Sequence, residues 1–357
     1  MDINRVLIAM SGGVDSSVTA YLLKNLGYDC IGAMMKLYDD TNLPDGNIGG
    51  CCSFEDAKDA RNVAASLDIP FYVFNFTDIF TDEVIDRFVS AYKCGKTPNP
   101  CIDCNRFVKF KKLINRACEL ECSHVATGHY ARISREKDGG YLLKAGLDKS
   151  KDQSYVLYAM TQNQLAHTLL PLGEMTKARV RELALKLNLV NAKKQDSQDI
   201  CFAPDGDYAG FIQRHTGKPS EKGMFISPDG TPLGEHRGLV NYTIGQRKGL
   251  GISASEPLYV CALSPENNTV TVGPKEALFT KFLTAVDINL IPVPKLTGAL
   301  RIKAKIRYNQ AAQPATVWQT GPDKLKIEFD NPQRAITPGQ AVVMYDGDIV
   351  VGGGTII

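Results

Sequence analysis

The first two hundred residues alternate short apolar runs with segments of helical period. The apolar runs that predict strands are 5–10, 28–37, 69–76 and 124–130. Between them, apolar residues recur every three or four positions and predict helices, among them one from Thr81 to about Tyr92 and one over 176–188. Strands and helices that alternate in this way predict an α/β fold with a doubly wound parallel sheet.

The pattern changes after about residue 203, where proline and glycine become frequent and the helical period fades. From about residue 280 onward, short runs alternate apolar and polar residues, which is typical of a small all-β barrel. Within 301–308 this alternation puts Arg301 and Lys303 on one face. That face is either a nucleic-acid contact or a solvated edge strand protected by lysine. We therefore expect three domains, at 1–203, 204–278 and 279–357.

Composition and charge narrow the class of protein. The chain has 357 residues, of which 44% are apolar and 22% charged, as in ordinary globular proteins. No apolar run approaches the roughly 18 residues of a membrane span, and the N-terminus lacks a signal-peptide pattern, so we expect a cytoplasmic protein with reduced thiols. The net charge of +2 predicts no partner, but seven basic residues against one acid lie within 93–116.

The sequence SGGVDSS, at 11–17, lies directly between the first predicted strand and a helix. Glycine lets backbone N–H groups approach an anion, and a helix N-terminus carries about half a positive charge, so this junction predicts a phosphate site. Asp15 is an acid where phosphates would lie, which favours contact with Mg²⁺. The chain lacks the GxxxxGK[ST] pattern of a kinase-type loop. The alternative is a turn that needs glycine only for its backbone.

The sequence TPNPCIDCN, at 97–105, is the second candidate site. Cys101 and Cys104 could form a redox disulfide, half a metal site or a sulfur-handling nucleophile, or they could be two ordinary buried thiols. Apolar residues at helical spacing after Cys104 predict a helix that starts near it, and the helix N-terminus would favour its thiolate. Along such a helix Cys118 lies roughly 20 Å from Cys104, which excludes one zinc ion bound to both.

Several motifs in the same chain carry a resemblance to a known family. SGGVDSS resembles the signature of the PP-loop ATP pyrophosphatases. The further motifs are TPNPCIDCN, ATGHYAR, DKSKDQSYVLY, DSQDICF, YTIGQRKGLG and TPGQAVVMYDGDIVVGGG. Together they resemble the bacterial tRNA-specific 2-thiouridylases, from residue 5 to the end. The resemblance implies an adenine nucleotide hydrolase-like PP-loop domain, a small central tRNA-contacting domain and a C-terminal β-barrel.

The resemblance also implies an activity. Enzymes of this family use ATP to adenylate the C2 oxygen of the wobble uridine of tRNA, then replace that oxygen with sulfur from a cysteine persulfide, releasing AMP and pyrophosphate. Cys104 would be the nucleophile, and Cys201 would carry the persulfide and form a transient disulfide with Cys104. The implied partners are a tRNA with a wobble uridine and a sulfur-donor protein, with no membrane.

Further residues are assigned by the same resemblance. ATP would contact Ala9, Met10, Ser11, Gly12, Gly13, Val14, Asp15, Ser16, Met35 and Gly128, with Asp15 taking part in catalysis. The target base would contact Asn99, Pro100 and Cys101. The tRNA would contact Lys151, Asp152, Gln153, Arg307 and Tyr308.

Two sulfur mechanisms stay open. One is a metal-free persulfide relay; the other is a [4Fe–4S] cluster on Cys101, Cys104 and Cys201 that delivers sulfide. Some members of the family carry Asp where this chain has Cys101, so three thiols are candidates. An adenylating ligase and a non-catalytic iron–sulfur or zinc RNA-binding module are the alternative functions. The sequence predicts core positions for Cys30 and Cys261 and assigns no role to Cys51, Cys52 and Cys94.

Overall fold

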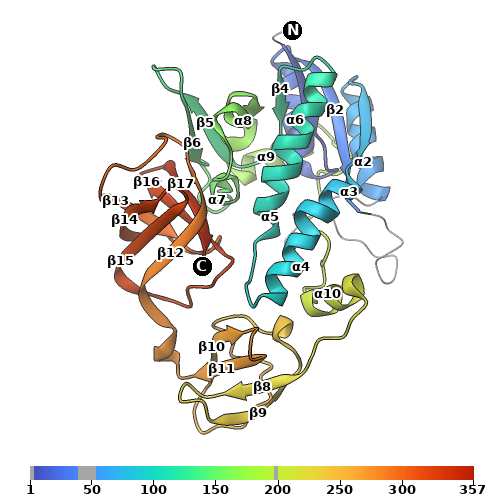
Figure 1. Cartoon of the computed structure of the whole chain (residues 1–357). Coiled ribbons are helices and arrows are strands. Elements are labelled where there is room, and N and C mark those ends of the chain that lie inside the picture. Colours follow the sequence, from blue (N-terminus) through green and yellow to red (C-terminus); the bar gives the residue numbers. More distant parts are fainter. Residues whose placement is uncertain (1–3, 39–53, 197–199) are drawn as a thin grey trace. The chain divides into compact units, whose positions relative to one another are not determined.

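The computed structural model describes residues 4–38, 54–196 and 200–357 (Figure 1). Cys51 and Cys52 lie outside the described residues. The chain divides into two compact units. The first unit comprises residues 1–85, 100–205 and 348–350, and the second comprises 86–99, 206–347 and 351–357. Within the described part of the chain, no helix is long and apolar enough to cross a bilayer.

A parallel sheet forms the centre of the first unit, with the strand order β3-β2-β1-β4-β7. The strands are β1 (Arg5–Ala9), β2 (Asp29–Lys36), β3 (Phe71–Asn75), β4 (His124–Ala126) and β7 (Thr168–Leu169). All four pairings are parallel, which confirms the predicted fold class. Because β1 lies between β2 and β4, the strand order reverses at β1. The carboxyl ends of β1 and β4 are therefore the place where sheets of this kind bind ligands.

Both faces of this sheet are covered. The helices α1 (Val14–Asn25), α2 (Phe54–Ser66) and α9 (Lys177–Lys186) share one core with strand residues such as Val6 and Ile8. Leu7, between those two residues, is fully buried as well and therefore points to the opposite face. Helix α6 (Leu113–Glu119) packs against β4 and runs in front of the sheet in Figure 1. A parallel sheet buried on both faces explains why its strands read as continuous apolar runs.

Two helices begin earlier than the sequence pattern predicts. Segments α3 (Thr77–Phe80), η3 (Thr81–Ile85) and α4 (Asp86–Lys93) follow one another without a break, so the helix expected from Thr81 starts at Thr77. Segments α5 (Pro100–Asp103), η4 (Cys104–Lys112) and α6 also form one helix, whose middle is π-helical. The helix expected to start near Cys104 starts one turn earlier, because proline is favoured at the first helical position.

The fourth strand is shorter than expected, because β4 ends at Ala126 and the chain then leaves the sheet. A hairpin that the sequence pattern did not predict follows it. The remaining elements of the first unit are β5 (Ala131–Arg135), β6 (Tyr141–Ala145), α7 (Ser154–Leu157), α8 (Gln162–Ala166) and η5 (Pro171–Glu174). Strands β5 and β6 are antiparallel, and Ile349 pairs with Lys144 of β6.

The second unit contains a helix, a small sheet and a barrel. Helix α10 (Tyr208–Thr216) was not predicted, although Asp207 caps its N-terminus and Gly217 ends it with φ +65°. The small sheet has the order β10-β11-β8-β9. Its strands are β8 (Gly223–Ile226), β9 (Pro232–His236), β10 (Tyr259–Ser264) and β11 (Thr269–Gly273), with the short helices η6 (Leu239–Asn241) and η7 (Lys275–Leu278) nearby in the chain.

The predicted C-terminal barrel is confirmed. Its strands follow the order β12-β15-β14-β13-β16-β17, and β12 also pairs with β17, which closes the sheet. They are β12 (Phe279–Leu290), β13 (Leu300–Lys305), β14 (Gln313–Gly321), β15 (Lys324–Arg334), β16 (Ala341–Asp346) and β17 (Ile349–Ile356). Strand β13 pairs with β14 and β16, so the interpretation of 301–308 as an edge strand is wrong. Closure of a barrel removes edges.

Candidate nucleotide and thiol site

The loop between β1 and α1 has the geometry of an anion cradle. Gly12 has φ +73°, and a Cβ atom on it would lie 2.4 Å from the backbone oxygen of Asp56 in α2. Gly13 is the N-cap of α1 and provides no side-chain cap, so the first-turn N–H groups are left for an anion. The hydroxyl of Ser16 accepts from the Ser11 N–H at 3.3 Å and donates to the Gly13 carbonyl at 3.0 Å.

Asn191 supports this loop from a distant part of the sequence. Its amide nitrogen donates to the Gly12 carbonyl and to the hydroxyl of Ser17, each at 2.8 Å. Asn191 is only 3% exposed. These two hydrogen bonds tie the loop to the segment that follows α9. Sequence reasoning missed this residue, since it follows α9 and belongs to no motif.

The carboxylate of Asp15 is held by two side chains that sequence reasoning also missed. The ammonium of Lys177 lies 2.7 and 2.8 Å from its two oxygens, and the hydroxyl of Tyr130 donates to one of them at 2.8 Å. Burial, together with the neighbouring Asp15, raises the pKa of Tyr130 above its usual range, so this group stays a hydroxyl donor. Asp15 therefore lies at the loop in a defined orientation.

A second carboxylate, Asp196, shares the same lysine. Lys177 lies 2.8 Å from it, Lys151 2.9 Å and Arg181 2.6 Å. Burial alone would raise the pKa of Asp196, but the hydrogen bonds from Lys151 and Lys177 lower it to about 2. Two acids and three bases thus form one network beside the phosphate loop, and Lys177 is the member that joins the acids.

Residues at the ends of the neighbouring strands border the loop. Gly128 follows β4, and a Cβ atom there would lie 3.0 Å from backbone atoms of Asp15 and Ser16. The chain therefore needs glycine at 128 to approach the loop. Met35 lies at the end of β2 and is half-buried. Its position, like that of Gly128, agrees with ligand binding at the carboxyl ends of the strands.

The three candidate thiols differ in exposure. Cys101 is exposed in the first turn of the helix, Cys104 is 8% exposed one turn further on, and Cys201 is intermediate. Because the helix starts at Pro100, the thiol closest to its positive end is that of Cys101 and not that of Cys104. The helix that carries both continues as the π-helical segment η4, a feature frequent at functional sites.

The segment around Cys201 is attached to the same part of the unit. The hydroxyl of Tyr38 donates to the Cys201 carbonyl at 3.2 Å. The ring of Phe202, 2% exposed, packs edge-on against Phe80 of α3. Helix α3 in turn contacts η4, which starts at Cys104. Both segments that carry the candidate sulfur chemistry therefore pack on α3.

No group of three metal-ligating side chains is found among the described residues. Among them, no three His, Cys, Asp or Glu side chains gather closely enough to hold a metal ion, and Cys101, Cys104 and Cys201 are all within the described part. Cys30 is buried in β2, and burial raises its pKa to about 11, as expected of a core thiol.

Residues that the resemblance assigns to tRNA have local partners. Lys151 bonds to Asp196, as described above, and the carboxylate of Asp152 accepts from the N–H groups of Gly146 and Ser154. The side-chain oxygen of Gln153 accepts from the Tyr130 N–H at 3.0 Å. These three residues thus shape the loop that holds Tyr130 against Asp15. In the second unit, Arg307 donates to the Ala335 carbonyl at 2.9 Å.

The stretch before the helix of Cys104 is held within the second unit. The Thr97 N–H donates to the Pro338 carbonyl, and the Gln340 side chain donates to the Thr97 carbonyl, each at 2.8 Å. In the same unit, Phe88 of α4 packs edge-on against Tyr208 of α10. Thr97 lies two residues before Asn99, so its two hydrogen bonds fix the backbone just before the first predicted base-binding residue.

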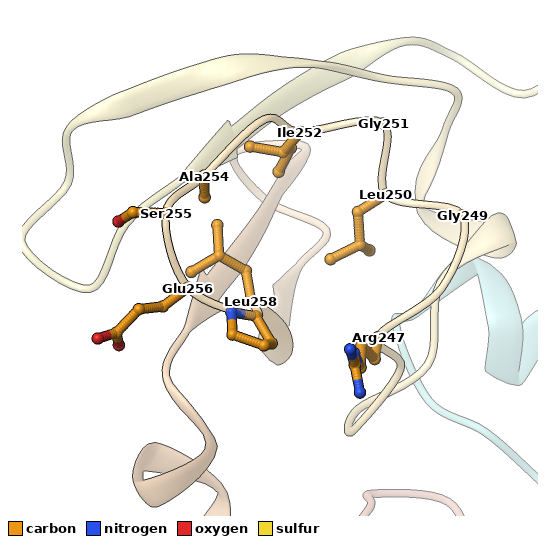
Figure 2. A pocket seen from close by; sticks show the side chains of 10 residues that line it. Arg247, Gly249, Leu250, Gly251, Ile252, Ala254, Ser255, Glu256 and Leu258 are labelled. Atoms are coloured by element: carbon orange, nitrogen blue, oxygen red, sulfur yellow. The ribbon is translucent and has the colours of Figure 1, made fainter.

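A pocket of about 370 Å³ lies in the second unit, in the loop formed by 247–258 (Figure 2). The side chains of Arg247 and Glu256 are its charged lining groups. None of the residues predicted for the nucleotide or sulfur chemistry lines it. It overlaps the motif YTIGQRKGLG, whose end provides Arg247, Gly249, Leu250 and Gly251.

Comparison with known proteins covers almost the whole chain. Residues 4–205 match the family model described as "tRNA methyl transferase HUP domain", 209–274 match "tRNA methyl transferase PRC-barrel domain", and 280–356 match "Aminomethyltransferase beta-barrel domain". The chain is 52% identical to the "tRNA-specific 2-thiouridylase MnmA" of Clostridioides difficile (strain 630), over 99% of this chain and 98% of that protein. It is 49% identical to the protein of the same name from Acetivibrio thermocellus, over the full length of both.

Solved structures show more distant likeness. The structure titled "U34-tRNA thiolase NcsA from Methanococcus maripaludis with its [4Fe-4S] cluster" is 18% identical, covers 60% of this chain and 68% of that one, and has a TM-score of 0.34. A likeness of this extent does not bear on function. The two near-full-length relatives, at about half identity, decide the assignment. The chain belongs to the tRNA-specific 2-thiouridylase family, and its residues 4–205 form a HUP domain.

Proposed function

We propose that this protein is a tRNA-uridine 2-sulfurtransferase, which uses ATP to form 2-thiouridine at the wobble position of tRNA. The observation that carries the proposal is full-length identity of about one half to tRNA-specific 2-thiouridylases. Support comes from one compact unit that contains the loop of Gly12 and Gly13, the helix that carries Cys101 and Cys104, and Cys201. We also propose the domain limits 1–203, 204–278 and 279–357.

The first step of the proposed reaction activates the base. The C2 oxygen of uridine is a poor leaving group, so it attacks the α-phosphate of ATP, and pyrophosphate leaves. Backbone N–H groups of the loop and of the first turn of α1 stabilise the negative charge on the phosphates. The nucleotide would be bound by Ala9, Met10, Ser11, Gly12, Gly13, Val14, Asp15, Ser16, Met35 and Gly128. When bound, Mg²⁺ would offset phosphate charge, with the carboxylate of Asp15 as its protein ligand.

The second step exchanges oxygen for sulfur. A sulfur-donor protein loads a persulfide onto Cys201. The thiolate of Cys104 attacks the inner sulfur, which releases hydrosulfide and forms a Cys104–Cys201 disulfide. Hydrosulfide adds to C2, AMP departs with the C2 oxygen, and an external thiol reduces the disulfide. We propose that Asn99, Pro100 and Cys101 contact the base, and that Lys151, Asp152, Gln153, Arg307 and Tyr308 contact the tRNA.

We propose the metal-free relay, with a [4Fe–4S] cluster on Cys101, Cys104 and Cys201 as the alternative mechanism. The test uses serine variants. Cys201→Ser should lose the cyanolysable sulfur that a sulfurtransferase loads, whereas Cys104→Ser should accept that sulfur and yet fail to thiolate tRNA. Cys101→Ser should lose only part of the activity. Cys118→Ser, an exposed cysteine on the same helix, is the matched control and should behave as wild type.

Each competing function has its own signature in this experiment. Wild-type sulfur loading in Cys201→Ser with none in Cys104→Ser would contradict the assigned roles. Loss of iron and activity together in Cys101→Ser would favour the cluster. An adenylating ligase would form AMP normally in Cys104→Ser and in Cys201→Ser. An RNA-binding module would bind tRNA without releasing pyrophosphate from ATP.

A further inference from the structure

Lys177 is buried between two acids at the edge of the phosphate loop. Its side chain is 9% exposed, and its ammonium lies within 2.8 Å of both oxygens of Asp15 and of one oxygen of Asp196. Its backbone N–H donates to the carboxylate of Asp148 at 2.9 Å, which fixes the first turn of α9. A lysine with so little exposure is present for a specific charge interaction, because burial of an unpaired ammonium is costly.

The position of Asp15 creates an electrostatic problem for the loop. Asp15 is the second residue of α1, so its carboxylate lies among the N–H groups that are to receive phosphates. ATP carries several negative charges, and a bare carboxylate beside them would oppose binding. Tyr130 donates a hydrogen bond to Asp15 but brings no charge. Among the ion pairs of the described residues, the cation that contacts Asp15 is Lys177.

We infer that Lys177 is the internal countercation of Asp15, which lets the phosphate loop accept ATP before a metal ion arrives. In this role it is a positioning residue, since it acts through Asp15. With Mg²⁺ bound beside the nucleotide, Asp15 would be its protein ligand, and Lys177 would stay paired through its second partner, Asp196. This inference rests on the proposed function only in taking ATP as the ligand of the loop.

The network offers a matched control for the loss of one cation. Arg181 also bonds to Asp196, at 2.6 Å, but no contact joins it to Asp15 among the ion pairs of the described residues. Lys177→Met and Arg181→Met therefore remove the same charge from the same network, and only the former exposes Asp15. Lys177→Arg keeps the charge.

The test measures binding of ATP without tRNA, by titration calorimetry, once in excess Mg²⁺ and once in EDTA. Lys177→Met should weaken metal-free binding about tenfold and binding with Mg²⁺ much less, because the metal supplies the missing charge. Arg181→Met and Lys177→Arg should keep the wild-type ratio of the two affinities. Asp15→Asn should strengthen metal-free binding, and Asp15→Asn with Lys177→Met should restore it, since no carboxylate is left to neutralise.

Rescue by Asp15→Asn separates a countercation from a structural support. If Lys177 only supports the fold, Lys177→Met should weaken ATP binding equally in Mg²⁺ and in EDTA, and adding Asp15→Asn should not restore it. That result would overturn the inference. Should Lys177→Met fail to fold, Asp15→Asn alone decides, because weaker metal-free binding in this variant contradicts the proposed repulsion. Failure of the wild type to bind ATP at all would instead overturn the proposed function.

Discussion

Gly12 and Gly13 are neighbours in one motif, yet the structure predicts opposite tolerance to alanine. At Gly12 the backbone has φ +73°, which L-residues rarely adopt, and a Cβ atom would lie 2.4 Å from the Asp56 oxygen and 2.8 Å from its Cα. At Gly13 the backbone is extended, with φ −86° and ψ 163°, and the nearest atom to a Cβ is the Ser11 hydroxyl at 3.5 Å. Only the first substitution therefore forces two elements apart.

The expected magnitudes follow from these contacts. Alanine at 12 costs about 1–2 kcal/mol for the left-handed backbone and a further 1–3 kcal/mol for overpacking against α2. Helix α2 cannot easily yield, because Asp56 and Asp59 are both bonded to Lys194, at 2.6 and 2.7 Å. Gly12→Ala should thus lower the free energy of unfolding of the first unit by about 2–5 kcal/mol, and Gly13→Ala by about 0.5 kcal/mol, as for an N-cap change.

Hydrogen exchange of the amides in β1 and α1 is the suitable assay, because the chain has two compact units and a single unfolding curve would mix them. Exchange of these amides should accelerate strongly in Gly12→Ala and hardly in Gly13→Ala, while the barrel strands β13 and β14 should be unchanged in both. Equal protection in the two variants would refute the argument, since it would mean that α2 moves aside at no cost.

Two further predictions follow from burial. At pH 8, iodoacetamide should label the exposed Cys94 and Cys118 of the native protein and should spare Cys30 and Cys122. The reason is that burial raises the pKa of Cys30 and of Cys122 to about 11. Mass spectrometry measures the labelling, and labelling of all four cysteines would contradict the prediction. Burial also lowers the pKa of His129 well below its usual range. Below about pH 6.5 the unfolded chain therefore binds a proton at His129 that the folded chain does not bind. The free energy of unfolding should thus decrease as the pH falls below about 6.5. Hydrogen exchange of the β1 and β4 amides at several pH values, each rate referred to the intrinsic rate at that pH, should show this loss, up to about 1.4 kcal/mol per pH unit. His129→Gln should reduce it, and an unchanged slope would assign the effect elsewhere.

The sequence alone determined those features that depend on neighbours in the chain. The apolar runs of β1 and β2 predicted strands, because parallel strands buried on both faces need continuous apolar residues. The glycine pair between β1 and α1 predicted the anion cradle, because its backbone conformation is a local property. The motifs were enough to predict the family, which the full-length relatives confirm. The roles of Cys104, Cys201 and the tRNA-contact residues remain predictions.

Only the tertiary structure decided what surrounds Asp15. Lys177 and Tyr130 lie 162 and 115 residues away in the chain, and neither belongs to a pattern that signals a carboxylate partner. The sheet order brings them together: β4 lies beside β1, and α9 packs on α1. Helix α10 escaped prediction because its one buried residue, Ile212, gives no apolar period. Local sequence patterns predict the conformation of a segment. The partner of a buried charge depends instead on which distant segments pack beside it in the folded chain.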